Sequence, residues 1–284
     1  MKSKKRAHKK YVKSKKRTHV KVINIDKLLN LQKKSIKHKD DKIQKHSKPK
    51  KEKKVQTGIP NLDKLIGGGF EKNSANVIVG GSGSGKTIFA TQFLIEGMKN
   101  GEKCLYVTFE EKKEQFYKHM LGFGWDLEEY ERKKLFTFLE YSPAKVKTML
   151  EEGGGTIESA IVRQGITRIV IDSITSFVLL FEKELERREA AVTLFGMIGG
   201  WNCTSLLTLE EDPLSEKELT AKPIEFESDS IILIYYIQYK GERRRYLEIV
   251  KMRGVKHSKR VHMFEVGHHG IMVSSKRISK IVGK

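Results

Sequence analysis

Cysteine is scarce in this chain of 284 residues, where only Cys104 and Cys203 occur. Both lie in apolar runs typical of buried strands, which favours two core thiols in a reducing compartment over a disulfide. No run of about 18 apolar residues is present, which argues against a membrane-spanning helix. The basic amino terminus also lacks the apolar segment of a secretory signal. We therefore expect a soluble, cytoplasmic protein with no membrane association.

Acidic residues are nearly absent from the first 56 positions. This segment holds 23 Lys and Arg against four Asp and Glu, a net charge of +19 out of +21 for the whole chain. So much charge of one sign repels itself and cannot bury a core. We predict that residues 1–56 form a largely disordered basic arm and linker, within which residues 20–36 could form a short amphipathic helix.

Aromatic residues are also scarce in the arm, where Tyr11 stands alone. Base stacking would therefore contribute little, and any binding to nucleic acid should be independent of sequence and sensitive to salt. An acidic protein partner and a solvated tail without a specific role are the alternatives that the composition leaves open.

Residues 57–284 have the alternating pattern of an α/β domain. After turn residues and a short apolar helix near Leu62, continuous apolar strands alternate with helices, which predicts a mainly parallel sheet covered on both faces. The last strands follow one another closely and predict a C-terminal antiparallel extension. The predicted strands are 76–79, 104–109, 134–139, 168–171, 203–208, 230–235, 246–251, 263–265 and 271–273. The predicted helices are 86–98, 112–121, 156–164 and 184–198.

A glycine-rich loop follows the first strand of this domain. The stretch Gly80–Thr87 has the pattern G-x-x-x-x-G-K-[ST] between an apolar strand and a helix, which predicts a phosphate-binding loop. Its glycines allow backbone amides to converge on phosphates, and the helix amino terminus favours negative charge. Lys86 would reach the β- and γ-phosphates, and Thr87 would bind Mg²⁺. The predicted ligands of ATP in this loop are Gly80, Gly81, Ser82, Gly83, Ser84, Gly85, Lys86 and Thr87.

Asp172 ends the apolar run that starts at Arg168. A carboxylate at the end of a buried strand suits a Mg²⁺ ion beside the phosphates, so we predict Asp172 and Thr87 as the metal site. The alternative is that Asp172 caps the following turn.

Two adjacent acids, Glu110 and Glu111, follow the strand after the glycine-rich loop. A carboxylate at this edge of the sheet could orient the water that attacks the γ-phosphate. The alternative is a pair of solvated acids that begin a helix, where the dipole favours them. Catalysis would then depend on Glu110, Glu111 and Lys86, and the pattern does not decide which glutamate is the base.

Several separate segments of residues 57–275 resemble the KaiC-like branch of the RecA superfamily of ATPases. The acidic pair and the run K-x-R-G-x-x-H at 251–257 are specific to this branch, whereas the phosphate-binding loop is not. The segments that carry the resemblance are Thr57–Asp63, Gly67–Phe70, Val107–Glu111, Phe123–Leu127, Lys134–Phe136, Ser142–Pro143, Gly241–Arg245 and Lys251–His257.

The resemblance implies a RecA-like fold and a homo-oligomeric ring, usually hexameric, with ATP held between subunits. On that basis Lys251 and Arg253 would reach the γ-phosphate of a neighbour's ATP, and His257 would help to bind that nucleotide. It also implies that Phe123 lies beside the base. Either Glu210 or Thr208 would occupy the family's sensing strand.

The functional expectation is a Mg-ATP hydrolase that serves as a regulatory or signalling switch. A recombinase-like DNA-repair ATPase that uses the basic arm is the alternative, and a nucleotide-dependent binding module without turnover is a third. The charged loop 211–223 offers only Ser215 and Thr220 as hydroxyl groups, so protein autokinase activity is doubtful.

Overall fold

The computed structural model describes residues 53–141, 155–181, 183–214 and 222–275. All of them belong to one unit, Glu52–Lys284. Residues 1–52 of the basic arm and linker, with the helix considered within residues 20–36, lie outside the described residues. At the start of the described chain, Val55 forms an isolated antiparallel bridge with Phe70.

A single nine-stranded sheet forms the centre of the domain. Its strand order is β3-β2-β4-β5-β1-β6-β7-β8-β9, in which the pairs from β3 to β6 are parallel and the pairs from β6 to β9 are antiparallel. This arrangement confirms the predicted parallel sheet with its antiparallel extension. The strands are β1 (Ala75–Gly80), β2 (Cys104–Thr108), β3 (Phe136–Glu140), β4 (Arg168–Asp172), β5 (Thr204–Glu210), β6 (Ser230–Tyr239), β7 (Glu242–Met252), β8 (Val261–Gly267) and β9 (Gly270–Val273).

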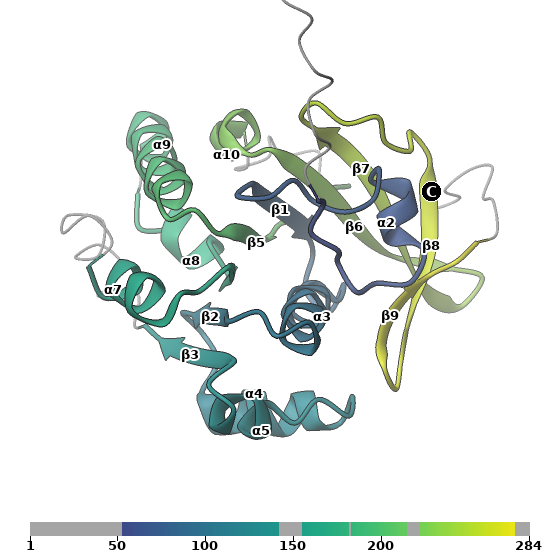
Figure 1. Ribbon diagram of the computed structural model, residues 1–284. Coiled ribbons are helices and arrows are strands. Elements are labelled where there is room, and N and C mark those ends of the chain that lie inside the picture. The colour runs from purple at the N-terminus through teal and green to yellow at the C-terminus, as the bar shows by residue number, and fades with distance from the viewer. Residues whose placement is uncertain (1–52, 142–154, 182, 215–221, 276–284) are drawn as a thin grey trace, which may run out of the picture. The chain divides into compact units, whose positions relative to one another are not determined.

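Helices cover both faces of the sheet (Figure 1). On one face lie α2 (Leu62–Leu65), α3 (Lys86–Lys99), α4 (Lys113–Leu121) and α5 (Leu127–Arg132), and on the other lie α7 (Gly155–Gln164), α8 (Thr175–Val178), α9 (Glu184–Gly200) and α10 (Lys222–Glu227). Sequence analysis missed α5, α8 and α10, which have four to six residues and are too short to show a periodic pattern. Among the described residues, no helix is both long and apolar enough to span a membrane.

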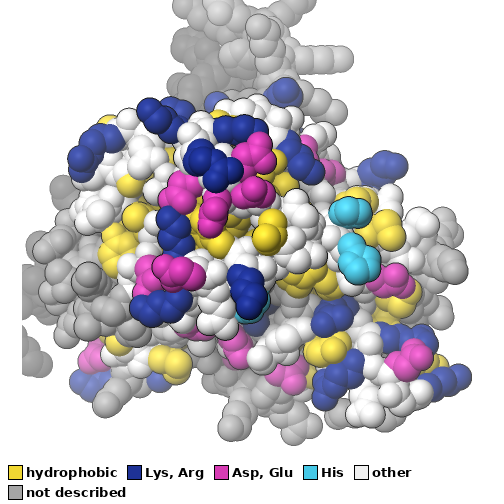
Figure 2. Space-filling view, turned by 90° about the horizontal axis from the view of Figure 1, so that it is seen from below, with side chains coloured by type: hydrophobic (Ala, Val, Ile, Leu, Met, Phe, Trp, Pro, Cys, Tyr) yellow, Lys and Arg dark blue, Asp and Glu magenta, His cyan; other side chains and the backbone are white. Residues whose placement is uncertain are grey.

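The surface of this domain carries charges of both signs. On the face drawn in Figure 2, Lys and Arg side chains are interspersed with Asp and Glu side chains. This mixture agrees with the nearly neutral balance of the residues that follow the arm, so the strong basic character of the chain belongs to residues 1–56.

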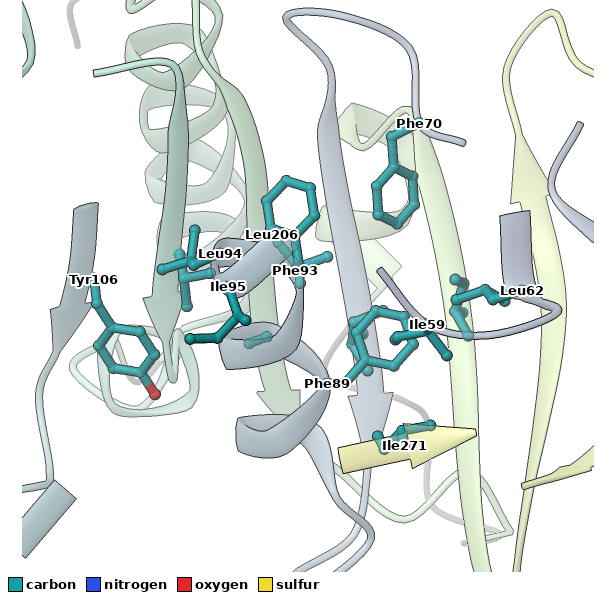
Figure 3. Close-up of a cluster of buried hydrophobic side chains, with 14 of the residues drawn as sticks. Ile59, Leu62, Phe70, Phe89, Phe93, Leu94, Ile95, Tyr106, Leu206 and Ile271 are labelled. Carbon is teal, nitrogen blue, oxygen red and sulfur yellow. The ribbon is translucent and has the colours of Figure 1, made fainter. Parts of the chain in front are cut away.

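The core consists of two layers, one on each side of the sheet. Along β1, Ile78 packs in the first layer, whereas Val77 and Val79 pack in the second, because successive side chains of a strand point to opposite faces. Figure 3 shows the first layer, where Phe93 of α3 meets Phe70 at a ring-centroid distance of 5.9 Å. Both cysteines are free thiols and both are buried, as predicted.

The strand register brings polar residues to one edge of the sheet. Gly80 is paired with Glu210, and Thr108 is paired with Asp172. All four lie at the carboxyl ends of parallel strands, which is where open α/β sheets bind ligands.

Candidate functional site

The loop between β1 and α3 has a backbone that requires glycine. Gly83 and Gly85 have φ values of 69° and 111°, in the left-handed region that other residues rarely adopt. At Gly80, a Cβ atom would lie 2.7 Å from Ser84 Oγ and 2.8 Å from the carbonyl oxygen of Ile234. The Ser84 hydroxyl is buried and has no hydrogen-bond partner among the described residues. The loop is therefore shaped as a cradle, with an unused polar group within it.

Lys86, the first residue of α3, folds back over this loop. Its Nζ donates to the carbonyl oxygens of Gly80 and Gly81 at 2.8 and 3.0 Å and lies 3.8 Å from Glu210 Oε2. Burial lowers the pKa of Lys86, and the nearby carboxylates of Glu210, Asp172 and Glu110 oppose this shift only in part. A buried ammonium group that donates to neutral carbonyl oxygens, with the Glu210 carboxylate 3.8 Å away, is suited to receive an anion.

Asp172 is the centre of a hydrogen-bond network at the end of β4. Its Oδ2 accepts from Thr87 Oγ1 at 2.7 Å and from the Tyr106 hydroxyl at 2.6 Å, and its Oδ1 accepts from Thr208. Burial raises the pKa of Tyr106 well above its ordinary value, and the Asp172 charge adds to this shift, so the phenol stays protonated and acts as a donor. The network fixes the Asp172 carboxylate beside the Thr87 hydroxyl.

Glu110 and Glu111 enter the site directly after β2. The Oε1 atom of Glu110 accepts hydrogen bonds from Ser173 Oγ at 3.0 Å and from Ser176 Oγ at 2.9 Å. Glu111 Oε1 lies 2.8 Å from Nδ1 of His119 on α4. Both backbone amides of the pair donate to Thr108 Oγ1 at 3.2 Å. The backbone of the pair is therefore anchored by the Thr108 hydroxyl, while the two carboxylates have different partners.

These groups line one pocket of about 300 Å³ at the carboxyl edge of the sheet. The structure thus brings together the loop, the metal-site candidates and both glutamates, which sequence analysis proposed from separate segments. The lining residues are Ser82, Gly83, Gly85, Lys86, Thr87, Ile88, Thr108, Glu110, Glu111, Asp172, Ser173, Glu210 and Arg245.

Arg245 of β7 is a member of this pocket that sequence analysis did not assign to the site. Its guanidinium donates to the carbonyl oxygen of Gly83 at 3.1 Å and lies 4.2 Å from the ring centre of Tyr236. Its place in the run Gly241–Arg245 was the only sequence signal, because 162 residues separate Arg245 from Gly83.

Comparison with known proteins shows to which family the chain belongs. The family model described as "ATPase: KaiC" matches residues 55–278. The chain belongs to the KaiC ATPase family. It is 32% identical to the UPF0273 protein PH0284 of Pyrococcus horikoshii over 241 residues, which are 80% of this chain and 96% of that protein.

Two further relatives show the extent of the KaiC likeness. The circadian clock protein KaiC3 of Synechocystis is 32% identical over 213 residues, which cover 72% of this chain but only 42% of KaiC3. The crystal structure of the KaiC-like protein PH0186 of Pyrococcus horikoshii superposes with a TM-score of 0.68 at 33% identity, covering 78% of this chain and 98% of that chain. The likeness therefore extends across nearly the full length of one single KaiC-like chain.

The residues that the KaiC resemblance assigns to a neighbour's nucleotide lie at the other edge of the sheet. Ser230, at the start of β6, is paired with Met252, whereas Ile234 is paired with Gly80 of the loop. Along β6, the Ser230–Met252 pair is therefore four residues, or about 13 Å, from the Ile234–Gly80 pair. Arg253 therefore lies far from the pocket of its own chain, where its guanidinium donates to the carbonyl oxygen of Phe226 and lies 3.4 Å from Asp229.

The other residues of this group have local partners. Lys251 Nζ donates to the carbonyl oxygen of Phe226 at 3.4 Å, and His257 Nδ1 lies 3.2 Å from the carbonyl oxygen of Val255. Phe123 stacks on Trp125 at 5.3 Å and is not among the pocket-lining residues, so its role beside the base stays a prediction.

The residues of the pocket fit a nucleoside triphosphate with Mg²⁺. The cradle has no room for a side chain at Gly80, has left-handed backbone at Gly83 and Gly85, and contains the Ser84 hydroxyl, which has no partner among the described residues and suits phosphate oxygens. Thr87 and Asp172 supply hydroxyl and carboxylate oxygens 2.7 Å apart, which are the ligand types that Mg²⁺ takes together with phosphate.

Proposed function

We propose that this KaiC-family protein binds Mg-ATP in the pocket and hydrolyses it. The observation that carries the proposal is the convergence of Lys86, Thr87, Asp172 and Glu110 around one pocket, from two strand ends and one helix. A phosphate cradle alone would indicate only nucleotide binding. A fixed carboxylate beside it adds what hydrolysis requires, a group that orients water.

Binding is assigned to the loop and to Lys86. The amides of Gly80–Thr87 hold the phosphates, and Lys86 Nζ exchanges its contacts with the carbonyls of Gly80 and Gly81 for phosphate oxygens. Thr87 and Asp172 hold Mg²⁺, which neutralises phosphate charge when it is bound. Tyr106 and Thr208 keep the Asp172 carboxylate in place by donating to its two oxygens.

Glu110 is the general base in this proposal. Ser173 and Ser176 both donate to its Oε1, which fixes the carboxylate and leaves Oε2 without a donor among the described residues. Oε2 would accept a hydrogen bond from the attacking water and take its proton as the water oxygen bonds to the γ-phosphorus, while the bond from that phosphorus to the bridging oxygen breaks and ADP leaves.

The amino edge of the sheet completes the site of a neighbouring copy. Arg253 and Lys251 lie at the opposite edge from the pocket of their own chain, so they can contribute to hydrolysis only at another subunit's nucleotide. Positive charge there would stabilise the charge that develops on the transferring phosphoryl group. We propose a ring of such copies, hexameric by family likeness, with His257 at the same interface and with hydrolysis switching the ring between states.

Replacement of the base tests the proposal. Glu110→Gln keeps the shape of the side chain and should lower phosphate release by about 10²-fold or more while ATP binding persists. Glu114→Gln, on the exposed side of α4, is the matched control and should hydrolyse ATP at the wild-type rate. If wild type releases phosphate no faster than Glu110→Gln while both bind ATP, the protein is a binding module and not a hydrolase.

A further inference from the structure

The two adjacent glutamates of the site are held by different groups. Thr108 Oγ1 anchors both backbone amides, yet the Glu110 carboxylate meets two serine hydroxyls from the β4–α8 segment, whereas the Glu111 carboxylate meets His119 of α4. Each glutamate is therefore oriented independently of its neighbour. Nothing in the proposed function uses the contact between Glu111 and His119.

The geometry of α4 explains how His119 reaches the site. Glu111 precedes the first residue of α4 by two residues, whereas His119 lies on the exposed side of the helix, in its last turn. The opposite side of α4 packs Phe116, Tyr117 and Met120 into the core, which fixes the rotation of the helix. His119 is therefore held near Glu111 by the packing of a whole helix rather than by a loop.

We infer that His119 is a positioning residue for the proposed hydrolysis, which acts by holding the Glu111 carboxylate at the mouth of the pocket through Nδ1 and Oε1. The inference rests on the proposed function. The contact measures 2.8 Å, and Glu111 is the less exposed of the two side chains, at 27% against 52%. Glu111 lines the pocket and His119 does not, so His119 affects ATP only through Glu111.

The chemistry of the contact fixes the proton on the imidazole ring. A carboxylate only accepts hydrogen bonds, so the neutral ring must carry its proton on Nδ1, and Nε2 is then the free acceptor. A free histidine has no such constraint. The Nδ1–H tautomer of His119 is thus a direct signature of its contact with Glu111, and it can be observed without any measurement of activity.

Steady-state kinetics of ATP hydrolysis test the positioning role. His119→Ala should lower kcat by about three- to tenfold and leave KM for ATP nearly unchanged, because the contact is partly exposed and the phosphate cradle is intact. His119→Asn should recover most of the rate, since its amide nitrogen can replace Nδ1 as the donor. Lys118→Ala, the next exposed residue on α4, is the control and should keep the wild-type rate.

Combination with Glu111→Ala tests whether His119 acts through that glutamate. In the Glu111→Ala background, where His119 has lost its acceptor, His119→Ala should produce no further loss, whereas an equal loss in both backgrounds would overturn the inference. A rise in KM without a change in kcat, or no recovery in His119→Asn, would also overturn it.

Nitrogen-15 NMR of the histidine rings separates this inference from the proposed function. At a pH where the ring is neutral, His119 should show the Nδ1–H tautomer in wild type and lose it in Glu111→Ala, which removes the acceptor. The Nε2–H tautomer in wild type would overturn the inference even if the protein hydrolyses ATP. If wild type shows the Nδ1–H tautomer but no turnover, the proposed function fails while the contact between His119 and Glu111 stands.

Discussion

Thr87, in the first turn of α3, and Asp172, the last residue of β4, share a hydrogen bond of 2.7 Å although they are 85 residues apart in sequence. Tyr106 from β2 donates to the same carboxylate oxygen of Asp172. Three separate segments thus meet at one carboxylate, because β2 and β4 are neighbours in the sheet and α3 begins beside their carboxyl ends. This meeting point is the structural basis for the proposed metal site.

Replacement of Asp172 should abolish metal-dependent turnover. Asp172→Asn removes the negative charge but keeps the side-chain shape, so we expect ATP hydrolysis to fall by about 10²-fold or more and Mn²⁺ binding with ATP, followed by electron paramagnetic resonance, to weaken. Tyr106→Phe is the matched variant, since it removes one donor and keeps the carboxylate. It should lose about 1 kcal/mol in free energy of unfolding and only a few-fold in rate. Equal losses in the two variants would argue against a metal role for Asp172.

Orientation of the base should depend on its two serine donors. Ser176→Ala removes one of the two hydrogen bonds to Glu110 Oε1 and should lower kcat by about threefold to tenfold, with ATP affinity unchanged. The double variant with Ser173→Ala should lose more than either single variant, because the carboxylate then loses both of its side-chain donors among the described residues. Phosphate release and ATP titration, carried out on the same samples, would check this. If the double replacement leaves the rate unchanged, Glu110 is not a base that these serines orient.

Sequence analysis predicted the fold well where the pattern was local. The stretch Gly80–Thr87 carries its own backbone requirements, and the buried strands showed as continuous apolar runs. Arg245 could not be found in that way, since its contact with Gly83 depends on how the β6–β7 hairpin lies beside the loop. The different partners of Glu110 and Glu111 were equally hidden, because they depend on where α4 and the β4–α8 segment pack.

Subunits with complementary defects should restore each other's activity. Arg253 lies at the amino edge and Lys86 at the carboxyl edge of the same sheet, so one replacement removes the group offered to a neighbour and the other damages the subunit's own site. Arg253→Ala and Lys86→Ala should each be inactive alone and regain part of the wild-type rate when mixed. Mixed rings must be demonstrated by mass measurement. If such rings form and no activity returns at any ratio, the proposal that neighbouring subunits share a site is wrong.

The ion pair between the buried Arg168 and the partly exposed Glu102 should make stability depend on pH. Arg168 is 2% exposed and Glu102 31% exposed, and Arg168 donates to both carboxylate oxygens of Glu102 at 2.9 and 2.6 Å. Burial would raise the pKa of Glu102, but these hydrogen bonds and the Arg168 charge outweigh it and hold the pKa below its ordinary value of 4.5. The stabilisation is therefore present above about pH 4.5 and is lost as the pH falls through the lowered pKa.

Glu102→Gln should then lower the free energy of unfolding by about 1–3 kcal/mol at pH 7, because it leaves a buried guanidinium without its countercharge. The difference from wild type should shrink as the pH falls below 4.5, where Glu102 of the unfolded chain takes up a proton, and should vanish below the lowered pKa of the folded state. Urea unfolding at several pH values would measure both effects. Glu129→Gln, which removes the exposed pair with Lys133, should change the stability by less than about 1 kcal/mol at any pH. A pH-independent loss in Glu102→Gln would contradict this account.

The basic arm should bind nucleic acid through charge alone. Residues 1–56 carry a net +19 with one tyrosine, so counterion release would drive the binding, and affinity should fall steeply with salt and vary little with sequence. Fluorescence anisotropy with unrelated DNA strands at several salt concentrations would show this, and a chain that begins at residue 53 should bind far more weakly. The rate of ATP hydrolysis then separates two roles. Stimulation by DNA that disappears with the arm would favour a recombinase-like repair ATPase. A rate that does not respond to DNA at low salt, despite binding, would favour the regulatory switch, because the arm would then only anchor the ATPase domain to an acidic partner.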